Sequence, residues 1–154
     1  MDKKYLKVNY QKNNDSIFVS SVGCELKISI EKTKKINPKN IIFFGSLTYE
    51  PNLTAIYWLI ENVMPYVWEK DQNIILNIAG RKPSNKLINL CKKNNQILLM
   101  PNPISMSKCI KDCSIAVLPL LSGSGQQNKI IEAMACGVPV ITTEIGASPF
   151  SFKN

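Results

Sequence analysis

The sequence contains no histidine, and no apolar run in it is long enough to cross a membrane. Without an imidazole, the Ser-His-Asp and Cys-His systems that activate a nucleophile are excluded. A spanning helix needs about 20 apolar residues, so none is expected. Five cysteines are present, an odd number, and no secretory signal precedes them. We therefore expect reduced thiols in a cytoplasmic protein and no disulfide scaffold.

Groups of metal ligands are also scarce. Cys109 and Cys113 have a spacing that lets them share a helix face, but two thiolates alone do not complete a tetrahedral zinc site. Ordinary packing is the favoured interpretation of this pair. We expect no metal and no other cofactor.

Positive charge comes almost entirely from lysine, and the 19 Lys+Arg residues outnumber the 11 Asp+Glu residues to give a net charge of +8. The lysines are scattered and lack the interleaved aromatic residues of a single-strand binder. Tyr57, Trp58 and the pair Phe43 and Phe44 fit core positions instead. A solvated lysine surface is favoured over nucleic-acid binding, whereas peripheral membrane contact, directly or through a partner, stays open.

Short apolar runs alternate with helical patterns from residue 41 onward. Strands are expected at 41–45, 73–80, 97–100, 114–120 and 138–143, and helices at 53–70, 84–93, 105–111 and 126–136. Pro65 should kink the first helix or end its first half. Apolar strands joined by helices predict one α/β domain, a doubly wound, Rossmann-like parallel sheet with right-handed crossovers.

The first 40 residues differ from the rest in being polar and rich in lysine. Only 17–20 (IFVS) and 26–30 (LKISI) have the pattern of short strands there. We therefore divide the chain into a polar leader with short strands at 1–40 and a Rossmann-like domain at 41–154, which the site described below makes a nucleotide-sugar-binding domain.

Four loops should converge at the carboxyl edge of the predicted sheet, where doubly wound proteins bind ligands. They contain Gly45 and Ser46, Gly80 and Arg81, residues 101–104, and residues 122–125.

The last of these loops opens the most informative segment, SGSGQQNKIIEAMACGVPVITT at 122–143. Gly123 and Gly125 let backbone amides approach an anion, and a helix with Lys129 in its early turns follows. Glu132 shares a helix face with Lys129, and its carboxylate can accept hydrogen bonds from a ribose diol. The segment thus indicates a nucleotide-sugar site.

Ordinary alternatives remain for each part of this segment. The glycine pattern lacks the third glycine of the dinucleotide fingerprint and also fits a tight strand-to-helix turn. Lys129 and Glu132 also fit an ion pair worth about 0.2–0.5 kcal/mol. A lysine about 4 Å from a phosphate gains about 1 kcal/mol in water and about 4 kcal/mol at an effective dielectric constant near 20, which favours the phosphate.

These residues resemble glycosyltransferase family 4. The segment GSGQQNKIIEAMACGVPVITT is similar to the donor-site signature of that family, and FFGSLTYEPNLTAIYWLIENVMP at 43–65 is similar to the first strand, loop and helix of its C-terminal domain. NIILNIAGRKP and the 97–119 stretch resemble the intervening segments in order and spacing. The resemblance implies half of a GT-B fold that binds a nucleoside-diphosphate sugar.

By this resemblance, Lys129 meets the pyrophosphate, Glu132 meets the ribose, and Gly45 lets the donor approach closely. Arg81 supplies a further cation, or is an ordinary solvated loop residue. Loop and helix-start amides bind the phosphates, and a Pro-Ile pair lies near the nucleobase. The remaining members of the predicted site are Ser46, Pro103, Ile104, Ser124, Gly125, Gln126, Gln127 and Asn128. No catalytic group is assigned.

The chain departs from the family at two positions. The family often has a second glutamate upstream of Glu132, and Ser124 stands at that position. Many members have an arginine and a lysine after the first strand, where this chain has Ser46 and no cation before Lys70.

The segment IFVSSVGCEL at 17–26 resembles the family's entry into its second domain, so we expect the acceptor-binding half to be missing. The expected function is the donor half of a retaining hexosyltransferase of glycan biosynthesis. It would act on a glycan or lipid acceptor and be inactive without an acceptor domain from another chain. The alternatives are a non-catalytic nucleotide- or partner-binding module and a degraded fragment.

Overall fold

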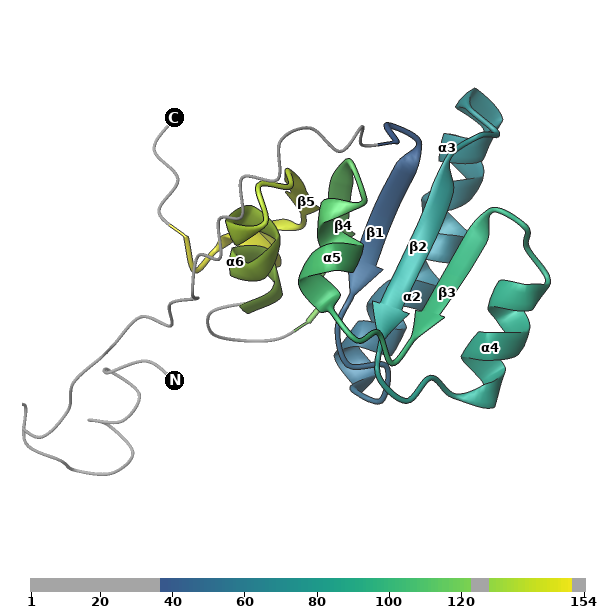
Figure 1. The fold of residues 1–154 in the computed structure, drawn as a ribbon, viewed down its shortest axis with the longest axis horizontal. Helices are drawn as coiled ribbons and strands as arrows, with labels where there is room; N and C mark the ends of the chain where they lie inside the picture. Colours follow the sequence, from purple (N-terminus) through teal and green to yellow (C-terminus); the bar gives the residue numbers. More distant parts are fainter. Residues whose placement is uncertain (1–36, 123–127, 151–154) are drawn as a thin grey trace, which may run out of the picture.

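The computed structural model describes residues 37–122 and 128–150. These residues form a five-stranded sheet in the order β3-β2-β1-β4-β5, with every pair parallel (Figure 1). The strands are β1 (Asn40–Phe44), β2 (Ile75–Gly80), β3 (Ile97–Pro101), β4 (Ile115–Leu118) and β5 (Val140–Thr142). The chain adds β2 and β3 on one side of β1 and then β4 and β5 on the other side, so the direction of winding reverses between β1 and β4, which is the doubly wound topology. The predicted fold class is confirmed.

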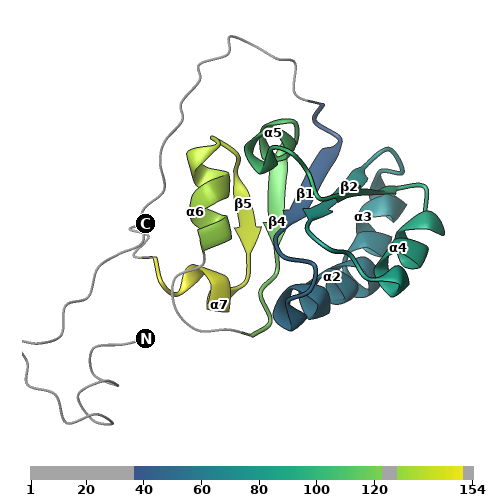
Figure 2. The ribbon, with the colours of Figure 1, turned by 60° about the horizontal axis from the view of Figure 1, so that its bottom comes forward.

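The connections between strands carry the helices. They are α2 (Glu50–Asn62), α3 (Met64–Lys70), α4 (Asn85–Lys92), α5 (Met106–Lys111) and α6 (Asn128–Ala135), and α7 (Glu144–Ala147) follows β5. Right-handed crossovers place α2, α3 and α4 on one face of the sheet and α5 and α6 on the other, as Figure 2 shows. The expected helices are all found in the described residues, whereas α7 was not expected.

The central strand β1 explains why the sheet is covered on both faces. Its residues Ile42, Phe43 and Phe44 are buried, so side chains on both sides of the strand lie in the core. A continuous apolar run is the pattern of a strand in a parallel sheet with helices on each face. The core is therefore built outward from β1.

The first helical region is broken where the proline predicts a break. α2 ends at Asn62 and α3 begins at Met64, with Pro65 in the first turn of α3. Proline is tolerated there because the first amides of a helix have no intrahelical acceptor.

The core prediction for Trp58 was wrong, since this side chain is 37% exposed. It falls outside the buried stripe of α2, which consists of Asn52, Ala55, Ile56, Leu59 and Ile60.

Helix α4 begins with a side-chain cap. Ser84 is extended, and its Oγ accepts a hydrogen bond from the amide of Leu87 at 3.2 Å. Replacing Ser84 by alanine should lower the free energy of unfolding by about 1 kcal/mol, because that amide loses its acceptor. Urea unfolding measures the change. An unchanged midpoint would mean that the cap contributes nothing.

Parts of the expected organisation fall beyond the described residues. The short strands at 17–20 and 26–30 lie outside them, and the division of the chain at residue 40 stays a prediction. In the described ranges, no helix is both long and apolar enough to pass through a bilayer.

Candidate functional site

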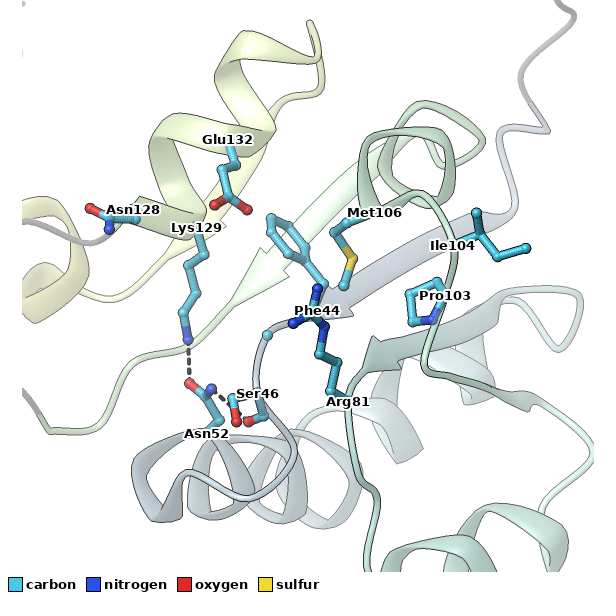
Figure 3. A pocket seen from close by; sticks show the side chains of 11 residues that line it. Phe44, Ser46, Asn52, Arg81, Pro103, Ile104, Met106, Asn128, Lys129 and Glu132 are labelled. Atoms are coloured by element: carbon cyan, nitrogen blue, oxygen red, sulfur yellow. Dashed lines mark hydrogen bonds between the residues drawn. The ribbon is translucent and has the colours of Figure 1, made fainter. Parts of the chain in front are cut away.

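A cavity of about 650 Å³ opens where the carboxyl ends of β1 and β2 face the start of α6 (Figure 3). It lies beside the point between β1 and β4 where the strand order reverses, which is where doubly wound sheets bind ligands. It is lined by Phe44, Gly45, Ser46, Asn52, Arg81, Pro103, Ile104, Met106, Asn128, Lys129 and Glu132.

All the predicted site residues that the structure describes line this cavity. They are Gly45, Ser46, Arg81, Pro103, Ile104, Asn128, Lys129 and Glu132. Ser124, Gly125, Gln126 and Gln127 were also predicted and lie outside the described residues. The loops after β1, β2 and β3 therefore meet as expected, while the part that each residue plays toward a ligand stays a prediction.

Three residues of the cavity wall were not predicted from the sequence: Phe44, Asn52 and Met106. Phe44 ends β1, and Met106 begins α5. Together with Pro103 they form an apolar wall opposite the lysine (Figure 3). Ile104 is fully exposed and lies at the rim. The cavity wall thus combines apolar side chains with the charged side chains of Lys129, Glu132 and Arg81.

Lys129 points from the first turn of α6 across to α2. Its Nζ donates a hydrogen bond to Oδ1 of Asn52 (Figure 3). The same Nζ lies 5.4 Å from the centroid of the buried Phe43 ring, within the range of a cation–π contact. The ammonium is therefore held at the wall of the cavity, partly shielded from bulk water.

Burial lowers the pKa of Lys129 to about 8, and the negative charge of Glu132 acts in the opposite direction. Desolvation favours the neutral amine because a protein wall solvates an ammonium less well than water does. A ligand that brings negative charge to this position would compensate the ammonium for the solvation by water that it has lost. Lys129 is accordingly suited to bind an anion.

Glu132 lies one turn further along the same helix, with its carboxylate exposed to the cavity. Although the spacing permits an intrahelical ion pair, the described residues include none between Lys129 and Glu132, because the ammonium turns to Asn52 instead. The oxygens of Glu132 are consequently available to accept hydrogen bonds from hydroxyl groups.

Comparisons with known proteins identify the family. A family model described as "Glycosyl transferases group 1" matches residues 38–152, most of the chain. The chain belongs to the group 1 glycosyltransferases. The resemblance carried by the motifs is confirmed.

A curated relative of this glycosyltransferase domain is an uncharacterized 44.6 kDa protein in the cps region of Klebsiella pneumoniae. It is 27% identical over 115 residues, which make up 70% of this chain and 30% of the relative. The chain therefore spans less than a third of the length of this relative.

Solved structures of similar fold include TarM, with a TM-score of 0.74 and 24% identity over 100% of this chain and 31% of TarM. A mutant of S. aureus TarM in complex with fondaparinux, alpha-GlcNAc-glycerol and UDP has a TM-score of 0.71 and 21% identity, with 100% and 31% covered. The GtfA/B complex has a TM-score of 0.60 and 18% identity, and the match covers 75% of this chain and 23% of the GtfA/B chain. These likenesses show the fold.

In this glycosyltransferase domain, positive charge reaches the first-strand loop from the neighbouring strand. No lysine or arginine follows Ser46 in the sequence before Lys70, but Arg81 follows β2 and lines the same cavity. The two loops are tied together, because the amide of Leu47 donates to the carbonyl of Arg81 at 3.2 Å. Among the described residues, the cavity wall thus includes two cations, Lys129 and Arg81, on opposite sides.

Proposed function

We propose that this chain is the nucleotide-diphospho-sugar-binding half of a retaining glycosyltransferase, which passes a hexose to a glycan or lipid acceptor. The observation that carries the proposal is the half-buried Lys129 ammonium on a cavity at the carboxyl edge of the sheet. Family membership supports it, since group 1 glycosyltransferases transfer sugars. The cavity is large enough for a small ligand.

The charged and the apolar parts of the cavity wall suit the two ends of a donor. Lys129 and Arg81 would bind the diphosphate, and Glu132 would accept hydrogen bonds from the ribose. The apolar wall with Pro103 and Met106 would lie against the nucleobase. Cations near the diphosphate would also stabilise it as it leaves, which is the transition-state charge that such transfer develops.

Transfer also needs an acceptor held against the donor. Relatives are about three times as long as the matched segment, which supports acceptor binding by protein beyond this sequence. We therefore expect the purified chain to bind donor without turning it over, since positioning of both reactants supplies much of the rate. Steady release of nucleoside diphosphate from a sugar donor, with a glycan acceptor present, would contradict this.

Titration calorimetry with UDP, GDP and ADP tests the binding proposal. UDP comes first because the TarM complex contains it. At least one of the three should bind with one site per chain, and the corresponding monophosphate should bind more weakly, because one charged phosphate is lost. If none of the diphosphates binds at millimolar concentration, the donor-half proposal is wrong.

Binding should also take up a proton near pH 8. In the ligand-free chain the Lys129 side chain is half protonated at its pKa of about 8 and fully protonated only at clearly lower pH. A bound diphosphate favours the charged form and raises this pKa, so binding at pH 8 draws a proton from solvent and the affinity falls as the pH rises further. Calorimetry in buffers of different ionisation enthalpy counts the protons. Proton-neutral binding at pH 8 would contradict this role of Lys129.

A further inference from the structure

Asn52 is the residue that α2 contributes to the cavity, and it is nearly inaccessible, with 4% of its surface exposed. Both ends of its amide are used. Oδ1 accepts the hydrogen bond from Lys129, and Nδ2 donates to the carbonyl of Ser46 at 2.8 Å. A side-chain amide thus links the lysine of α6 to the loop that follows β1.

The surrounding backbone leaves little freedom for another arrangement. Gly45 has a positive φ of 147°, and a Cβ atom there would lie 2.9 Å from Nδ2 of Asn52. The same Cβ would lie 3.8 Å from Nζ of Lys129. The loop therefore passes close against the amide, so the position of Asn52 and the position of the ammonium are determined together.

The neutrality of this partner has a chemical consequence. An amide oxygen brings no counter-charge to the ammonium, whereas a carboxylate at the same place would neutralise it and compete with an incoming anion. The charged groups around the cavity in the described residues are Glu132 on α6 and Arg81 after β2, and only Glu132 affects the pKa of Lys129. α2 adds no charge at the contact.

We propose that Asn52 is a positioning residue that holds the Lys129 ammonium on the cavity wall as an unneutralised cation, so that α2 and α6 together form the anion site. The part that concerns diphosphate rests on the proposed function. The part that concerns Lys129 does not, because the contact exists in the ligand-free protein.

The decisive variant is Asn52→Asp, which gives the partner of Lys129 a negative charge with almost no change in shape, although it also removes the Nδ2 donor to the Ser46 carbonyl. It should raise the pKa of Lys129 by about 1–3, as an adjacent opposite charge does. It should weaken UDP binding about 10-fold at pH 7, because the diphosphate must displace a carboxylate from the ammonium. Lysine-labelled NMR titration, with Lys129 assigned from its loss in Lys129→Met, measures the pKa, and calorimetry measures the affinity.

Asn62→Asp is the matched control. Asn62 lies at the end of the same helix, is exposed, and its Nδ2 donates to the carbonyl of Trp58 at 3.1 Å. The substitution places the same charge on α2 away from the cavity. It should leave both the pKa of Lys129 and the affinity for UDP close to those of the unaltered chain.

A double-mutant cycle separates positioning from a general structural effect. Asn52→Ala, which adds no charge, should cost affinity when Lys129 is present and little when it is combined with Lys129→Met. Asn52→Asp is not used in the cycle, because without Lys129 its carboxylate would itself repel the diphosphate. Equal losses with and without Lys129 would overturn the proposal.

The two proposals fail in different ways. If no diphosphate binds the unaltered chain, the donor-half function is wrong, and the NMR titration of ligand-free protein still decides the role of Asn52. If Asn52→Asp leaves the pKa of Lys129 as it is in Asn62→Asp, Asn52 does not set the state of the ammonium, and this inference is overturned.

Discussion

Replacing Lys129 by methionine should weaken UDP binding about 10- to 100-fold, the value of a hydrogen bond to a charged group. Methionine keeps much of the length of the side chain and removes only the cation. The loss should be large because the ammonium is already partly desolvated and is held in place by Asn52, so little reorganisation is needed on binding. Calorimetry at pH 7 measures it.

Two controls separate this effect from damage to the fold. Lys129→Met should change the urea midpoint little, because removing the penalty for a half-buried ammonium offsets the loss of its hydrogen bond to Asn52. Lys70→Met removes a lysine from the last turn of α3, next to the start of β2 at the opposite edge of the sheet, and should leave UDP binding unchanged. Equal losses for Lys70 and Lys129 would assign the effect to net charge alone.

The fold could be predicted because its signals are local. The run at 41–44 has the composition of a doubly covered strand, and alternation of such runs with helical patterns leaves few topologies once crossovers are right-handed. Features that depend on tertiary packing were missed. α7 is a single short turn of four residues, and the outward position of Trp58 follows from which side of α2 meets the sheet.

The site was predictable only where its residues lie near one another in the chain. Lys129 and Glu132 are three residues apart and share one helix face, so their spacing in the sequence is enough to predict that they lie together. Asn52 is 77 positions from Lys129 and stands in the first turn of α2, where a polar residue normally indicates only a helix start. Sequence spacing cannot show which of many asparagines a buried lysine will meet. The fold decides this by bringing α2 and α6 to the same strand ends.

Gly45 illustrates the same limit. The family resemblance predicts that it allows the donor to approach, and its place on the cavity wall is compatible with that. Its backbone also has a φ that favours glycine, and a side chain there would crowd Asn52. The glycine therefore leaves room for the Asn52 side chain even in the ligand-free protein, and the sequence motif alone does not indicate this role.

Gly80 controls the same region from the neighbouring strand. Its own Cβ, if present, would lie 2.0 Å from the carbonyl oxygen of Gly45 and 2.6 Å from Cγ of Leu47. The first of these atoms is backbone, so the loop after β1 would have to move as a whole. That movement would strain the hydrogen bond from the Leu47 amide to Arg81 and shift the Ser46 carbonyl that holds Asn52.

Gly80→Ala should consequently lower the free energy of unfolding by about 3 kcal/mol, at the upper end of overpacking costs, and reduce UDP affinity in the protein that remains folded. Gly137→Ala is the control, because Gly137 has a positive φ of 73° but no atom within 4 Å of an added Cβ. That control should cost about 1–2 kcal/mol through backbone strain alone and leave binding intact. Urea unfolding and calorimetry on both variants measure the difference. If Gly80→Ala is no worse than Gly137→Ala, or binds UDP normally, the close packing of the β1 and β2 loops does not hold the cavity in shape.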